Sequence, residues 1–132
     1  MVLYFWIAAG SAIGGMCRFA LSGLVAHRFG ETLPWGTFAV NFIGSFLIGF
    51  IACLSAPDGR LLIGPTSRHL LMTGILGGFT TYSSFSLQTL NLARDGDFVR
   101  AGAYATGTLI LCFIAVWLGH VIASWINTAN PI

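Results

Sequence analysis

The centre of one apolar stretch of this chain reads Gly77-Gly78-Phe79-Thr80-Thr81-Tyr82-Ser83-Ser84-Phe85. The flanking stretch, about residues 70–93, has no charged residue and is long enough to cross a bilayer, which takes about 20 residues. Paired glycines followed by a run of hydroxyl side chains make a poor continuous helix. Backbone that leaves the helix inside a membrane is tolerated only where protein covers it or water reaches it. The stretch therefore predicts a broken membrane helix, with a binding or permeation site at the break.

The composition places the rest of the chain in the membrane as well. Hydrophobic residues make up 56% of the 132 residues and charged residues only 8%, so a soluble fold would expose one large apolar patch. Four stretches come close to or exceed the length that spans hydrocarbon. We predict membrane helices at about residues 2–26, 35–56, 70–93 and 101–126. Together they form a single transmembrane domain, residues 1–132, in an all-α integral membrane protein.

The side chains that carry chemistry exclude several classes of function. All four acids lie in the predicted loops, so no span holds a carboxylate that could carry a proton. The three histidines and three cysteines lack the spacing of metal ligands, and no nucleophile–base pair or phosphate loop is visible. The small net charge of +2 does not suggest nucleic-acid binding. We expect neither an enzyme nor a proton-coupled exchanger.

The arginines of the loops divide almost evenly between the two sides of the membrane. Arg60 and Arg68 fall on the side of the termini, and Arg28, Arg94 and Arg100 fall on the other side. Because positively charged loops orient a membrane protein, two against three gives hardly any preference. One interpretation is insertion in both orientations, which would allow an antiparallel homodimer. The other is a weak bias that Arg18 or the bilayer decides.

Two polar side chains inside the spans are candidates for binding a small anion. Arg18 is the one formal charge well inside a span, and such a charge marks a functional position unless it snorkels from the helix end. Asn41 offers two amide N–H donors without a charge. Its alternative role is a hydrogen bond between helices. The residues alone leave both alternatives open.

The broken segment could serve either an anion or a cation. Its hydroxyls can donate to an anion, and the positive ring edges of Tyr82 and Phe85 could approach one. We expect Gly77 and Gly78 to supply the backbone freedom that releases carbonyls from the helix. Released carbonyls could instead hold a cation such as sodium. A third possibility is a kink that only shapes the helix.

Four motifs in this chain resemble those of the small bacterial fluoride channels of the Fluc/CrcB type. They are Gly14-Gly15-Met16-Cys17-Arg18-Phe19; Gly36-Thr37-Phe38-Ala39-Val40-Asn41 followed by Gly44 and Gly49; the run from Gly74 to Ser86; and Tyr104 with Thr108. The motifs occur in the family's order and spans and cover nearly the whole chain, and the third is the most specific. The resemblance implies a fluoride-selective channel that passively exports fluoride from the cytoplasm and so lowers its toxicity. It also implies a multi-pass protein of the bacterial plasma (inner) membrane.

The resemblance further implies a dual-topology, antiparallel homodimer with two fluoride pores between its subunits. The fluoride path would be lined by Asn41, Tyr82, Ser83, Ser84, Phe85, Tyr104 and Thr108. In that path Asn41 would donate to fluoride, and Tyr82 and Phe85 would offer ring edges. Arg18 would stand in a vestibule. Partners would thus be fluoride, the lipid bilayer and a second copy of the chain, with no nucleic acid.

The resemblance also implies a cofactor, a structural sodium ion that is not transported. Backbone carbonyls of Gly77 and Thr80 would hold it at the dimer centre. The chain departs from the family's usual pattern at two positions. Tyrosine stands at position 82 in place of phenylalanine, so its hydroxyl could donate to the anion or narrow the pore. Gln88 stands where glutamate is common, so no role is assigned to a charge there.

Two rival functions belong to other classes. A small dual-topology multidrug exporter also has four helices, but that class uses an acid in the first span, where this chain has Arg18. A non-conducting membrane scaffold would use its polar stripes only for packing. Fluoride is strongly hydrated, so a pore must replace its water donors and still bind weakly enough for release. Amides, hydroxyls and ring edges meet both requirements, which favours the channel.

Overall fold

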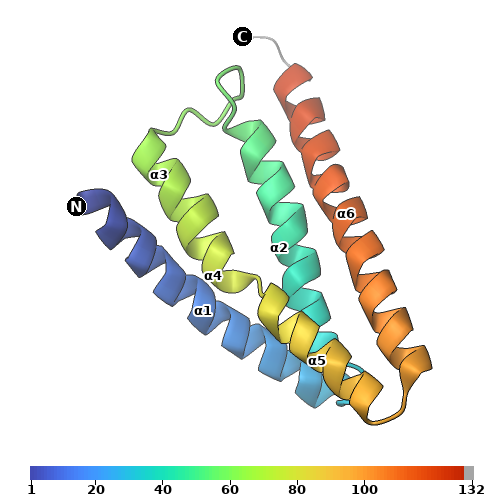
Figure 1. Cartoon of the computed structure of the whole chain (residues 1–132). Coiled ribbons are helices and arrows are strands. Elements are labelled where there is room, and N and C mark those ends of the chain that lie inside the picture. Colours follow the sequence, from blue (N-terminus) through green and yellow to red (C-terminus); the bar gives the residue numbers. More distant parts are fainter. Residues whose placement is uncertain (130–132) are drawn as a thin grey trace.

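The computed structural model describes residues 1–129, which form helices joined by short connections (Figure 1). The elements are α1 (Val2–Phe29), α2 (Trp35–Leu54), α3 (Pro65–His69), the π-helical segment η1 (Leu70–Leu76), α4 (Gly77–Phe79), α5 (Tyr82–Arg94) and α6 (Phe98–Thr128). The stretch from α3 to α4 is one continuous rod, and α5 follows it after two extended residues. The described residues contain no strand. The predicted all-α fold with a broken third span is confirmed.

The unbroken helices differ in length from the predicted spans. α1 ends at Phe29 rather than near residue 26, α2 ends at Leu54 rather than near residue 56, and α6 extends over 31 residues from Phe98. Each of these three helices is long and apolar enough to cross a membrane. The third span does not reach that length in one piece, because the break divides it.

The connections gather at two opposite ends of the bundle (Figure 1). Residues 55–64 lie beside the end of α6, and the connections that precede α2 and α6 lie together at the other end. The first of these ends carries Arg60, and the second carries Arg28 and Arg94. This is the arrangement expected for a chain that crosses the membrane four times.

Glycines set how closely the helices approach one another. A Cβ at Gly14 of α1 would collide with the carbonyl oxygen of Ile75 in η1. A Cβ at Gly49 of α2 would likewise collide with the carbonyl of Val116, where α2 runs along α6. Without a hydrophobic driving force between helices in lipid, such close backbone contact is a main source of helix association.

The break in the third span lies at Thr80 and Thr81 and not at the paired glycines. Gly77 is helical (φ −63°, ψ −37°), whereas Thr80 (φ −80°, ψ 158°) and Thr81 (φ −152°, ψ 103°) are extended. Any residue adopts these angles, so the expected role of the glycines in freeing the backbone was wrong. Gly78 has a packing role instead, because a Cβ there would lie 2.5 Å from the carbonyl oxygen of Ser11 in α1.

Candidate functional site

Asn41 of α2 bonds to both backbone polar groups of Thr81, in the middle of the break. The Thr81 N–H donates to Asn41 Oδ1 over 2.7 Å, and Asn41 Nδ2 donates to the Thr81 carbonyl over 3.0 Å. Because Thr81 presents one donor and one acceptor, the amide has a single orientation that satisfies both. Asn41 can therefore form the hydrogen bond between helices and still have an N–H left to donate to an anion, so the two roles considered for it are compatible. The amide nitrogen has a second hydrogen, which finds no acceptor within residues 1–129.

The break releases several carbonyls from the helical ladder. In a continuous helix the Thr81 N–H would donate to the carbonyl of Gly77, but here it donates to Asn41. The Ser84 N–H would donate to the carbonyl of Thr80, but it donates to the Thr81 hydroxyl over 3.2 Å. That hydroxyl caps the start of α5. The carbonyls of Gly77 and Thr80, the two residues predicted to hold sodium, are among the released oxygens, together with those of Gly78 and Phe79, which accept no backbone N–H of residues 1–129 either.

A cavity of about 270 Å³ lies beside the break, between α2, α5 and α6. It is lined by Asn41, Gly44, Ser45, Ile48, Thr80, Tyr82, Phe85, Thr108, Leu109 and Cys112. A Cβ at Gly44 would collide with the Thr80 methyl, so the glycine lets α2 approach the break. The cavity brings together four of the predicted path residues, from three separate segments of the chain.

Three aromatic rings continue from this cavity along α5 and α6. The ring centroids of Tyr82 and Phe85 lie 5.4 Å apart, as do those of Phe85 and Tyr104, with interplanar angles of 59° and 50°. Phe85 is 8% exposed and Tyr82 is 74% exposed. Tilted rings of this kind present edges to their neighbours and to the space between them. Phe85 is thus held in place by this chain alone, while Tyr82 projects from its surface.

Hydroxyl groups lie on the α6 side of the cavity. Thr108 is buried, and it lines a second cavity of about 210 Å³ as well. Tyr104 also lines the second cavity and donates its hydroxyl to Oε1 of Gln88 over 3.2 Å. A threonine hydroxyl that borders open space can donate to a small anion.

The remaining predicted residues lie around this arrangement. The Ser84 hydroxyl accepts from the Thr81 hydroxyl over 3.0 Å, and the Ser83 oxygen lies 3.4 Å from the same hydroxyl oxygen. Ser83 is exposed and lines neither cavity. Arg18 is half-buried on α1 and lines neither cavity in the single chain.

Two residues of the site escaped the sequence analysis. Thr81 organises the break by capping α5 and pairing with Asn41, and the Thr-x-x-Ser spacing before a helical run was a signal for a cap. Gln88 accepts from Tyr104, a contact across two helices that no local pattern reveals. Among the described residues no cluster of His, Cys, Asp or Glu could hold a metal ion.

Comparison with known proteins covers nearly the whole chain. Residues 5–120 match the family described as CrcB-like protein, Camphor Resistance (CrcB). The fluoride-specific ion channel FluC of Opitutus terrae is 63% identical over 128 residues, 97% of this chain and 97% of the relative. Its counterpart in Methylocella silvestris is 52% identical over 124 residues, 94% of this chain and 95% of the relative. The one in Paramagnetospirillum magneticum is 50% identical over 127 residues, 96% of this chain and 99% of the relative.

Proposed function

The chain belongs to the CrcB family, and we propose on that premise that it is a fluoride-selective channel through which fluoride leaves the cytoplasm passively. It is a multi-pass protein of the bacterial inner membrane. One structural observation supports the channel above all others. Amide, hydroxyl and ring groups from α2, α5 and α6 converge on one cavity at the depth where the third span is broken. Relatives named for fluoride channels favour this function over a multidrug exporter.

The proposed path replaces the water around fluoride with weak donors. The second amide hydrogen of Asn41 and the hydroxyl of Thr108 donate from two sides of the cavity. Phe85 and Tyr82 add ring edges, and Tyr104, Ser83 and Ser84 continue the path. No formal charge lines the cavity, so fluoride is bound weakly enough to be released. Passive conduction involves no covalent chemistry, and no catalytic residue is proposed.

The pore is proposed to be completed by a second, antiparallel copy of the chain. Gly77 and Tyr82 are exposed at the level of the break, next to the released carbonyls. Backbone oxygens without partners cannot face lipid. A second copy packed on this face would cover them and would bring its own break to the same place. Arg18 is proposed to lie in the vestibule of that assembly.

The released carbonyls of Gly77 and Thr80 fit a structural sodium ion. Sodium prefers hard oxygen ligands, and carbonyls freed at a broken membrane helix provide them. When bound, the ion would supply a positive charge that holds carbonyls of two copies together. It would act as a structural cofactor and would not be transported. We expect that removal of sodium from purified protein lowers fluoride flux and releases monomers. Full flux from a sodium-stripped protein in sodium-free buffer would contradict the site.

Efflux from liposomes tests the proposed function. Purified protein is reconstituted in liposomes loaded with potassium fluoride or potassium chloride, and efflux is followed with ion-selective electrodes after addition of valinomycin. We expect rapid fluoride efflux with little chloride efflux. If a correctly folded protein released no fluoride, the channel would be excluded, and a non-conducting membrane scaffold would remain as the function. Proton-driven export of a cationic drug would instead identify an exporter.

A further inference from the structure

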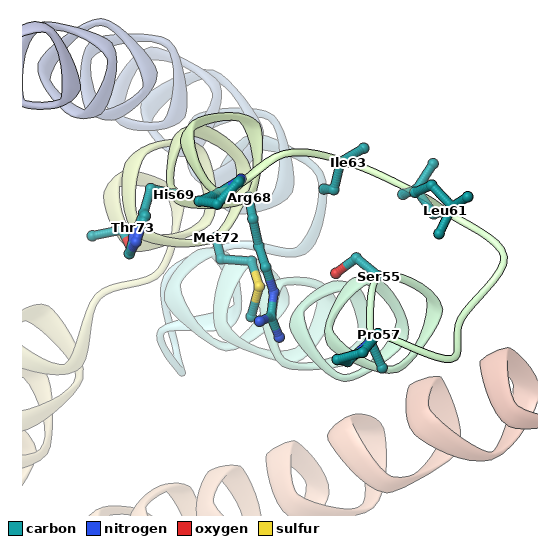
Figure 2. A pocket seen from close by; sticks show the side chains of 11 residues that line it. Ser55, Pro57, Leu61, Ile63, Arg68, His69, Met72 and Thr73 are labelled. Atoms are coloured by element: carbon teal, nitrogen blue, oxygen red, sulfur yellow. The ribbon is translucent and has the colours of Figure 1, made fainter.

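Another cavity of the chain lies where α2 ends and α3 begins (Figure 2). It encloses about 460 Å³. Its walls are Ser55, Ala56, Pro57, Leu61, Leu62, Ile63, Pro65, Arg68, His69, Met72 and Thr73. None of these residues lines the cavity at the break. The fluoride path therefore gives this cavity, here called the interfacial pocket, no role.

The interfacial pocket lies at the level of the lipid headgroups. α2 has 20 residues, which at about 1.5 Å per residue gives a rod of about 30 Å, the thickness of the hydrocarbon core. Ser55 follows the last residue of that rod. The pocket is formed at this end of the bundle, so its opening faces the boundary between hydrocarbon and water.

Arg68 brings into the pocket a positive charge that has no counterion among residues 1–129. Figure 2 shows its side chain reaching from α3 toward the end of α2, past Met72. No carboxylate of residues 1–129 lies within 4.0 Å of it, and Asp58 of the same connection does not line the pocket. His69, beside it, has Nδ1 3.4 Å from the Thr73 hydroxyl oxygen, which leaves the other ring nitrogen for a further partner. An arginine fork suits the oxygens of a phosphate.

One wall of the pocket is apolar. Leu61, Leu62 and Ile63 follow one another in the connection, and Leu62 is 85% exposed. Three consecutive apolar residues are unfavourable in a connection that faces water, but they are favourable against acyl chains at the membrane boundary. Met72 adds apolar surface from η1. A phospholipid would use both features, because its phosphate would meet the cation and its acyl chains would meet the apolar wall. A free phosphate ion would use only the cation.

We propose that the interfacial pocket binds an anionic phospholipid, with Arg68 on the phosphate and the residues 61–63 along the first carbons of its acyl chains. His69 provides a second donor for the phosphate oxygens. The site requires insertion in the membrane but does not require fluoride conduction. Lipid binding therefore tests the proposed lipid site, and fluoride efflux separately tests the channel.

Retention of lipid by the purified protein tests this proposal. The unmodified protein, Arg68→Gln and the control Arg94→Gln are placed in nanodiscs of phosphatidylglycerol and phosphatidylcholine, and bound lipid is measured by native mass spectrometry after release. Arg94 is also exposed, but it lies at the other end of the bundle and outside the pocket. We expect Arg68→Gln to weaken phosphatidylglycerol binding about fivefold to tenfold, and Arg94→Gln to leave it unchanged.

Three results would overturn the proposal. Equal losses in the two variants would mean that phosphatidylglycerol responds only to overall charge. Equal retention of phosphatidylcholine and phosphatidylglycerol would mean that the pocket does not select an anionic headgroup. Displacement of the lipid by millimolar inorganic phosphate would identify a free anion as the ligand. Because Arg68 is exposed, its substitution should leave the fold intact, which circular dichroism verifies.

Discussion

Asn41 serves two purposes with one carboxamide. Its oxygen and one of its N–H groups hold the backbone of Thr81, and the other N–H remains beside the cavity. A side chain that only packed helices together would not need to border open space. A side chain that only bound an anion would not need to fix the break. The geometry of the break and the proposed donation to fluoride therefore depend on the same residue.

We expect Asn41→Asp to lower fluoride flux by at least about tenfold, because a carboxylate replaces the donor by a charge that repels the anion. The carboxylate would also face the Thr81 carbonyl, which loses its donor. Liposome efflux measures the change, with Asn91→Asp as a control that adds the same charge at an exposed position of α5. Unchanged flux through a correctly assembled Asn41→Asp protein would remove Asn41 from the path.

At Tyr82 the question is whether the side-chain hydroxyl contributes to fluoride conduction. The hydroxyl makes no hydrogen bond within residues 1–129, and the ring packs 5.4 Å from Phe85. We expect Tyr82→Phe to conduct fluoride within about twofold of the unmodified rate, since no bond worth about 1 kcal/mol is lost. Tyr82→Leu, which removes the ring edge, should conduct less. A large loss in Tyr82→Phe would instead assign the hydroxyl to the anion or to the second copy.

At the scale of elements, the sequence correctly predicted that the third helix is broken, but it attributed the break to the wrong residues. An uncharged stretch of membrane length with a run of hydroxyls was enough to predict a break. The position of the break depends on Asn41, which lies 40 residues away and takes the Thr81 N–H from the helix. Gly78 is explained by α1, whose backbone crosses there. Both reasons are tertiary contacts, so no pattern within the stretch could reveal them.

Two glycines of α1, one at the crossing with η1 and one away from it, allow a matched pair of substitutions on one helix. A Cβ at Gly14 would collide with the Ile75 carbonyl, whereas a Cβ at Gly23 would meet nothing within 4 Å. We expect Gly14→Ala to lower the free energy of unfolding by about 1–3 kcal/mol, because backbone must move to make room. Gly23→Ala should leave it unchanged or raise it by up to about 1 kcal/mol, since alanine favours helix. Titration with SDS, followed by circular dichroism, measures both. Equal effects of the two variants would mean that this crossing is loosely packed.

At the scale of the whole molecule, the proposed channel needs more than a single chain. Its cavity is open on the side where Tyr82 projects, and the carbonyls released at Gly77 and Thr80 need partners that residues 1–129 do not provide. The sequence predicted four of the residues that line the cavity at the break, namely Asn41, Tyr82, Phe85 and Thr108. It could not predict how far one chain encloses them, because enclosure depends on how the helices tilt and cross. An antiparallel copy is the simplest completion, since it brings the same break to the same depth.

Such a dimer requires that the chain insert in both orientations, and the arginines allow it. Arg60 and Arg68 lie toward one end of the bundle, and Arg28, Arg94 and Arg100 lie toward the other. We expect a Ser67→Cys variant, with the native cysteines replaced, to react with an impermeant maleimide from outside the cell in roughly half of the molecules.

Additional positive charge at one end should abolish both the mixture and the activity. Asn91→Arg with Asp95→Arg adds two arginines near the connection between α5 and α6, both at exposed positions. Because positive charge stays in the cytoplasm, we expect nearly all of these chains to insert one way, with the Ser67→Cys label outside. Alone they should carry no fluoride, and flux should return when they are expressed with a chain biased in the opposite sense. Full flux from chains that all point one way would contradict the antiparallel dimer, whatever the fluoride selectivity of the protein.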